Sequence, residues 1–233
     1  MNIVDVIIVL SLLFGSIVGF KKGAISTGVS FVGLVLAIVL SAILRRPVAE
    51  FMYEHLPFLD FGGIFKGVTV LNILLYEVIA FFLVFSILQI GVGLLSKVAN
   101  IIEKALDFTI VLGIPSKIIG IFVGFIETYI YVFIVMYFLT LPMFNIGIVK
   151  DSKITDKILN NTPILTNTVG GTLNAFQSVY ELKEANLTKE EYSLKSLDII
   201  LKYEIADVKS VDNLIKSGKL KINDAESILD KYR

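Results

Sequence analysis

Residues 2–44 read NIVDVIIVLSLLFGSIVGF, then KKG, then AISTGVSFVGLVLAIVLSAIL. Each of the two apolar runs has about the 20 residues that an α-helix needs to cross a hydrocarbon core of roughly 30 Å. A secretory signal peptide places its charges before a shorter apolar core, whereas here Lys21 and Lys22 follow a full-length run. The stretch therefore predicts a transmembrane hairpin whose first helix is retained.

Small residues recur at helical spacing in both runs. The first run holds Gly15, Gly19 and Gly23, and the second holds Ser26, Ser30, Gly33, Ala37 and Ser41. Because lipid tails are as apolar as leucine, membrane helices associate through close backbone approach, which small residues at this spacing permit. We interpret both stripes as helix-packing faces. A permeation path lined by the same residues is the alternative.

Two further apolar segments are long enough to span. One covers residues 68–95 and is long enough to cross with tilt. The other covers residues 115–141, where Pro115 fits a first helical turn and Gly120 and Gly124 continue the spacing by four. The predicted fold is an all-α integral membrane protein with transmembrane helices at about 2–20, 24–44, 68–95 and 115–141.

The connections between these spans are more polar. Pro47 is expected to end the second helix, and residues 48–67 mix rings and charges as an interfacial loop with a short helix does. Residues 97–114 place apolar side chains on one side and Glu103 with other polar residues on the opposite side. That pattern predicts an amphipathic helix lying in the membrane surface.

Several of these features resemble one family of bacterial membrane proteins. Asp5, the turn Gly19-Phe20-Lys21-Lys22-Gly23 and Gly33 resemble the opening hairpin of the colicin V production protein (CvpA) family. The stretch GIFVGFIE at residues 120–127 resembles that family's last span, although a basic residue is expected near Glu127 and is missing. The resemblance implies four membrane helices and a structural or accessory role in toxin (bacteriocin) production or export. It carries over no catalytic residue.

Composition limits the function. With 55% hydrophobic and 18% charged residues and a mean hydropathy of +0.82, the chain is too apolar for a soluble domain of this length. The zero net charge gives no reason to expect nucleic acid as a partner. Cysteine is absent, His55 is the single histidine, and no G-x-S-x-G turn occurs. We expect no enzyme activity, no cofactor and no metal site.

Three ionisable residues fall inside the predicted spans: Glu77, Lys117 and Glu127. A charge near the bilayer midplane costs about 2.5 to 3.5 kcal/mol, so such groups face a neighbouring helix, a hydrated cavity or the interface. Glu77 and Glu127 fall at similar depth on antiparallel helices and would form a titratable site if they face each other. That arrangement suits a small proton- or ion-coupled transporter. In the other interpretation each carboxyl lies near the interface, close to tyrosine hydroxyls.

The chain becomes polar after Pro142, and we predict a mostly helical tail at residues 143–233. Pro163 and Gly170-Gly171 suggest a broken segment before a helix from about Thr172. Helix-start signals follow at three places: Thr188 with Glu191, Ser210, and Asn223 with Glu226. Gly218 is expected to end the middle helix.

Topology and partners follow less directly. The two short connections hold Lys21, Lys22, Lys97 and Lys104, and the longer loop holds Arg45, Arg46 and Lys66. The difference of one basic residue between the two sides is too small to determine the orientation in the membrane. Some members of the resembled family carry an extracytoplasmic protease domain after the last span, which favours both termini outside the cytoplasm. We expect a multi-pass protein of the cell membrane whose partners are the lipid bilayer and other membrane or envelope proteins. Self-association into a homo-oligomer is left open.

Overall fold

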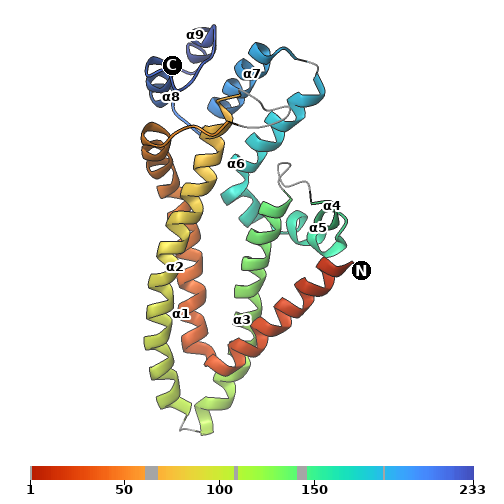
Figure 1. Ribbon diagram of the computed structural model, residues 1–233. Helices are drawn as coiled ribbons and strands as arrows, with labels where there is room; N and C mark the ends of the chain where they lie inside the picture. The colour runs from red at the N-terminus through yellow and green to blue at the C-terminus, as the bar shows by residue number, and fades with distance from the viewer. Residues whose placement is uncertain (1, 61–67, 108–109, 141–145, 186) are drawn as a thin grey trace. The chain divides into compact units, whose positions relative to one another are not determined.

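The computed structural model describes residues 2–60, 68–107, 110–140, 146–185 and 187–233. Over these residues the chain is helical and contains no strand (Figure 1). Three long helices come first: α1 (Ile3–His55), α2 (Leu71–Asp107) and α3 (Ile110–Leu139). The shorter elements are α4 (Gly147–Lys150), α5 (Lys153–Asn160), α6 (Pro163–Glu181), η2 (Leu182–Ala185), α7 (Lys189–Lys202), α8 (Val208–Lys216) and α9 (Ala225–Leu229).

The three long helices are long and apolar enough to cross a membrane, over Ile3–His55, Leu71–Lys104 and Gly113–Leu139. Much of their apolar surface faces outward: Phe14, Ile90 and Phe122 are each about two-thirds exposed. Such a surface is stable where lipid replaces water as the solvent. The predicted class, an all-α membrane protein, is confirmed. The count of four spans stays a prediction.

Helix α1 is broken at Gly23, whose φ of 79° and ψ of 177° are not helical. This positive φ is accessible to glycine and strained for residues with a β-carbon. The break divides α1 into a first arm (residues 3–22) and a second arm (residues 24–55). Figure 1 shows the first arm, in red, folding back from the second, in orange.

The second arm continues beyond the predicted end. Pro47 lies inside α1, which runs on to His55, so the predictions of a helix end before Pro47 and of a loop from residue 48 are wrong. Proline removes a single backbone donor, and membrane helices tolerate that loss because neighbouring groups compensate. The helix ends two residues before Pro57, since the residue preceding a proline disfavours the helical conformation. Residues 61–67 of the predicted loop lie outside the described residues.

Two other boundaries differ from expectation. Residues 97–107 continue α2, so the separate surface helix predicted over 97–114 is not found. Helix α3 begins at Ile110, and Pro115 lies inside it. The apolar and polar positions in residues 97–104 are inverted relative to a helix on a surface, because Ile101 is 71% exposed and Glu103 is 2% exposed.

The described chain forms two compact units. Unit 1 comprises Met1–Leu40 and Phe85–Ile164, and unit 2 comprises Ser41–Val84 and Leu165–Arg233. The domain boundary predicted at residue 142 stays a prediction, because residues 141–145 lie outside the described part of the chain.

In unit 1 the start of α1 is tied to α5 through Asp5. The carboxylate of Asp5 accepts hydrogen bonds from the Ser152 hydroxyl at 2.6 Å and from the Ile154 amide at 3.1 Å. Ser152 is also the N-cap of α5, because its hydroxyl accepts a hydrogen bond from the Thr155 amide. A buried acidic residue in the first run therefore positions the segment that follows α3.

In unit 2 the tail helices pack around an apolar core. Leu197, Ile200, Val211, Leu214 and Leu220 are each at most 2% exposed. The Tyr192 hydroxyl donates a 2.6 Å hydrogen bond to the Val179 carbonyl and joins α7 to α6. Helix α6 runs through Gly170-Gly171 from Pro163, so the predicted break before Thr172 is wrong. Proline at the first helical position loses no helical hydrogen bond.

The helix starts in the tail were predicted with mixed success. The capping box of Thr188 and Glu191 is confirmed. The N-cap of α8 is Asp207 rather than Ser210, and its side chain accepts from the Ser210 amide. The residue preceding α9 is Asp224 rather than Asn223. Gly218 lies just beyond α8 with a φ of 74°, in agreement with its predicted role at the end of that helix.

Candidate functional site

The first arm of α1 packs against α3 through glycines. A β-carbon built on Gly124 would lie 2.5 Å from the carbonyl oxygen of Gly15 and 2.9 Å from the Cα of Gly19. A β-carbon on Gly19 or on Gly120 would collide with the backbone of the other. Backbones this close leave no room for a side chain on Gly19, Gly120 or Gly124. A β-carbon on Gly15 would overlap the Thr128 side chain. The glycine spacing in the sequence thus corresponds to a helix contact in unit 1.

Gly23 faces the carboxylate of Glu103. A β-carbon on Gly23 would overlap that carboxylate, which accepts hydrogen bonds from the amides of Ile25 at 2.6 Å and Ser26 at 3.3 Å. The Ser116 hydroxyl of α3 donates to the same carboxylate and accepts from the Ala24 amide. The first backbone N–H groups of the second arm have no acceptor within that helix, and Glu103 accepts their hydrogen bonds. A negative charge is also favourable at the start of a helix.

Hydroxyl groups connect the second arm to α2. Ser30 and Ser96 hydroxyls lie 2.7 Å apart, and the Ser26 hydroxyl donates to the Ser96 carbonyl at 3.3 Å. Further along, a β-carbon on Gly33 would lie 2.5 Å from Cγ1 of Val92. The second arm and α2 are thus in close contact within unit 1.

A cavity of about 400 Å³ adjoins these hydroxyls in unit 1. Its charged lining residues are Lys22 from the first arm, Lys97 from α2 and Glu127 from α3. Gln89 and Tyr131 also line it, and the Tyr131 hydroxyl donates to the Gln89 amide oxygen at 3.1 Å. The amide nitrogen of Gln89 is buried without a hydrogen-bond partner. Most of the residues that line this cavity are therefore polar, although it lies among helices apolar enough to span.

Glu77 has a different environment, in unit 2. Its side chain is 1% exposed, and one carboxylate oxygen lies 3.4 Å from Nε of Arg45. The other oxygen, Oε1, is buried without a hydrogen-bond partner. Arg45 was expected at the end of a span, but it lies within α1. An ion pair with Arg45 lowers the cost of burying the Glu77 charge.

The three predicted intramembrane polar residues belong to two units. Glu127 lines the cavity of unit 1, Glu77 pairs with Arg45 in unit 2, and Lys117 lies half-buried on α3. The hypothesis that Glu77 and Glu127 face each other stays a prediction. His55 is exposed and stacks on the Phe51 ring with centroids 4.3 Å apart.

In unit 2 the tail is attached to the end of α1. The Lys219 ammonium donates to the carbonyls of Tyr53 at 3.2 Å, Leu56 at 3.3 Å and also Glu54. A cation is favourable there because the last carbonyls of a helix lack internal partners. The Ser210 hydroxyl donates to the Glu50 carboxylate, so α8 is held to the same helix.

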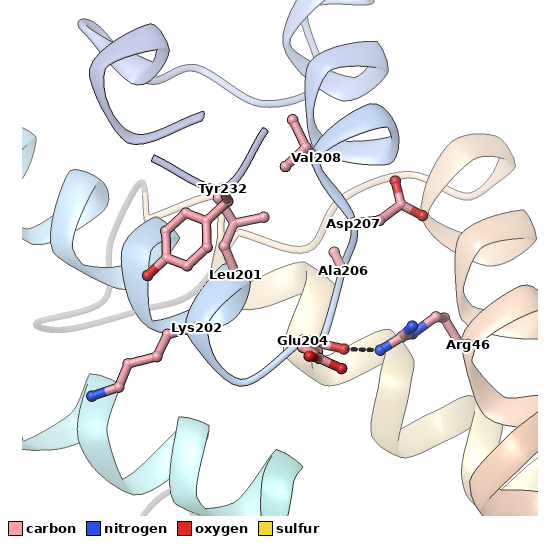
Figure 2. Close-up of a pocket in the computed structure, with 8 residues that line it drawn as sticks. All are labelled: Arg46, Leu201, Lys202, Glu204, Ala206, Asp207, Val208 and Tyr232. Atoms are coloured by element: carbon pink, nitrogen blue, oxygen red, sulfur yellow. Dashed lines mark hydrogen bonds between the residues drawn. The ribbon is translucent and has the colours of Figure 1, made fainter. Parts of the chain in front are cut away.

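Figure 2 shows a second cavity, of about 360 Å³, beside this attachment. The Arg46 guanidinium donates to the Glu204 carbonyl on one side. Glu204 has a φ of 53° in the turn between α7 and α8. The hydrogen bond from Arg46 to its carbonyl fixes that turn against α1. Tyr232 and Lys202 line the cavity on the side away from Arg46.

The sequence alone indicated no role for Lys219 or for the polar stripe of α2, and it indicated a water-facing position for Glu103. The stripe had a detectable signal, because it follows helical spacing along one face. Its members are Gln89, Gly93, Ser96, Lys97 and Asn100. Lys219 carried no such signal, since its carbonyl partners are about 165 residues away in the chain and carbonyl groups are present at every residue.

Comparisons with known proteins agree with a membrane protein. A family model described as Colicin V production protein matches residues 4–163, which include α2, α3, α4 and α5 and all of α1 but its first residue. The chain is also 28% identical over 175 residues to a protein of Bacillus subtilis (strain 168) named Uncharacterized transmembrane protein YshB. That match covers 70% of this chain and 92% of the relative. No solved structure matches the chain significantly.

Proposed function

Because the chain belongs to the colicin V production protein (CvpA) family, we propose that it has a structural, accessory role in producing or exporting a toxin such as a bacteriocin. The part of the proposal that concerns a toxin rests on the family's name, and the attachment of the tail supports the accessory role. A protein of this kind needs no catalytic residues or cofactor. It acts by holding partner proteins of the membrane or envelope in place.

The observation that carries this proposal is the contact of Lys219 with the end of α1. Three backbone carbonyls receive its ammonium, and the Ser210–Glu50 hydrogen bond lies on the same helix. A partner that binds the tail is thereby held at a defined position relative to α1. A flexible tether would give no such positioning.

The test is a toxin-release assay in cells that lack the native protein. Lys219→Met removes the ammonium and keeps a long apolar stem, so we expect reduced toxin release at normal membrane levels. Lys221→Met is the matched control, because Lys221 is exposed two residues away. Unchanged release after complete deletion of the protein would reject the accessory role.

We also propose four membrane crossings, with both arms of α1 spanning separately and both termini outside the cytoplasm. The first arm has the length needed to cross the hydrocarbon core, and Gly23 supplies the reversal. The chain contains no cysteine, so Lys221→Cys gives a single labelling site on the exposed tail. An impermeant thiol reagent should label it in intact cells; labelling only after lysis would reverse the orientation.

The cavity in unit 1 favours a second candidate function, proton- or ion-coupled transport. It brings Glu127 together with Lys22 and Lys97 among helices that are otherwise apolar. Ionisable groups beside a polar cavity in spanning segments are typical of transport paths. Glu127→Gln separates this function from the accessory role, because it keeps the shape of the side chain but removes the titrating group.

A further inference from the structure

The polar stripe of α2 is not explained by helix packing alone. Gln89, Ser96, Lys97 and Asn100 line the cavity of unit 1 from one helix, whereas Ile90 and Leu94 on the same helix are more than half exposed. Polar side chains in a spanning helix are costly unless they meet partners. Ser96 has partners in Ser26 and Ser30, whereas the Gln89 amide nitrogen is buried without one. That nitrogen therefore needs water or a ligand in the cavity.

The charged residues of the lining indicate which kind of ligand fits. Lys22 and Lys97 provide two ammonium groups, and Glu127 provides a single carboxylate. The carboxylate balances one cation and leaves the other without a counter-charge in the lining. A bound anion supplies that missing charge and the acceptor oxygens that ammonium groups require.

We propose that this cavity binds the phosphate group of a phosphate ester, with Lys22 and Lys97 as its charged partners. The proposal goes beyond the accessory role, which requires no ligand.

The neutral residues of the lining are also suited to phosphate. The Gln89 amide is held on its oxygen side by the Tyr131 hydroxyl, and its nitrogen is buried without a partner. Asn100 adds a further donor group to the lining. Since buried donors are nearly always satisfied, the Gln89 nitrogen is a direct indication of an acceptor that the protein itself does not supply.

The lining does not suit a metal cation. Among the described residues no group of three or more His, Cys, Asp or Glu lies together. Hard cations need several oxygen ligands, usually with carboxylates among them, and Glu127 is the single carboxylate of the cavity. Two lysines beside it would repel a cation.

The phosphate has two chemical sources, an anionic phospholipid headgroup or a soluble phosphate ester. The lipid source is favoured, because the exposed side chains of Ile90 and Leu94 adjoin the stripe and offer apolar surface for acyl chains. Lys22 lies directly before the reversal at Gly23, and lysine side chains near helix ends reach the headgroup region.

The experiment uses the full-length protein in neutral detergent with three probes: dioleoyl phosphatidylglycerol, dioleoylglycerol and glycerol 3-phosphate. Binding is measured by equilibrium retention of each probe. We expect Lys22→Gln and Lys97→Gln each to weaken phosphatidylglycerol binding about fivefold. Lys21→Gln is the matched control, because Lys21 is exposed in the same turn and does not line the cavity; it should change binding by less than about twofold.

The outcomes are distinct. Phosphatidylglycerol binding that depends on Lys22 and Lys97 supports the lipid source, and glycerol 3-phosphate binding with that dependence supports the soluble source. Equal loss in Lys21→Gln would mean unspecific attraction to surface charge and would overturn the proposal. Equally tight binding of dioleoylglycerol, which has no phosphate, would overturn it as well.

Glu127→Gln provides a variant with the opposite expected sign. It keeps the shape of the side chain but removes the carboxylate that competes with the ligand for the two lysines. Binding of the phosphate probe should become about fivefold tighter. A gain in affinity cannot come from misfolding, so this variant remains informative if a lysine variant folds poorly. Weaker binding in a folded Glu127→Gln protein would overturn the proposal.

Discussion

Gly15 and Gly124 lie so close that a β-carbon built on Gly124 would be 2.5 Å from the Gly15 carbonyl oxygen. The opposing atom is backbone, which cannot turn aside as a side chain does. The cost of enlarging Gly124 must therefore be met by separating the first arm of α1 from α3. This contact holds the reversal of α1 against α3 in unit 1.

We expect Gly124→Ala to destabilise the protein by about 1 to 3 kcal/mol, because overpacking forces the backbones apart. The control is Gly91→Ala, since a β-carbon there meets nothing within 4 Å and alanine has the higher helix propensity. Thermal unfolding in detergent measures both. If the two variants have the same melting temperature, the close approach of Gly15 and Gly124 does not stabilise the fold.

The Glu103 carboxylate is expected to stabilise the reversal of α1. Glu103→Ala leaves the amides of Ile25 and Ser26 without their acceptor, which costs about 1 to 3 kcal/mol for buried groups. Trypsin should then cut faster after Lys22, because the turn opens more often. Lys104→Ala changes the exposed neighbour and should leave the cleavage rate unchanged. Equal rates in both variants would show that the turn does not depend on Glu103.

The C-terminal end of the tail is expected to detach in acid. Burial raises the pKa of Asp198, but hydrogen bonds from Lys231 at 2.7 Å and from the Tyr232 hydroxyl at 2.8 Å outweigh it, so the pKa lies below its usual value of 3.8. A carboxylate whose pKa is lower in the folded protein stabilises the attachment above about pH 4. That stabilisation is lost as the pH falls through the pKa that Asp198 has in the folded protein.

A nitroxide on Ser227→Cys, in α9, reports this detachment in the full chain. Its mobility should rise as the pH falls below about 4. Adding Asp198→Asn should make the label mobile at every pH, because the amide lacks the charge that attracts Lys231. A pH-dependent rise that persists in Asp198→Asn would assign the effect to another group.

Local features of the sequence were sufficient for the membrane class and for the reversal of α1. Residues 2–44 contain both apolar arms, and the glycine at position 23 is the residue that tolerates the positive φ. The Thr188 capping box was also predictable, because both partners are three residues apart. Such features depend on neighbouring residues alone.

Glu103 and Arg45 required the arrangement of whole helices. Periodicity identified the face of α2 that carries Glu103 but predicted that this face lies toward water, because an amphipathic pattern is typical of a helix on a membrane surface. In a membrane the apolar side faces outward, and Glu103 turns to the amides of Ile25 and Ser26. Arg45 was assigned to a loop because Pro47 follows it, so its ion pair with Glu77 was not foreseen.

Substitution of Glu77 and substitution of Glu127 are expected to have different effects. Glu77→Gln removes the buried charge that pairs with Arg45. Breaking a buried ion pair by removing one partner costs about 3 to 5 kcal/mol, so this variant should melt at a lower temperature. Glu127 instead lines the cavity of unit 1, so Glu127→Gln should fold normally.

Glu127→Gln is therefore the variant that distinguishes accessory function from transport. If the protein transports protons or ions, the variant keeps the cavity shape but loses the titrating group, and coupled flux into proteoliposomes should disappear. If the role is accessory, toxin release should be unchanged at normal membrane levels. Glu77→Gln cannot make this distinction, because its loss of stability would lower either activity. Loss of toxin release together with a shifted pH optimum in folded Glu127→Gln would favour transport over the accessory role.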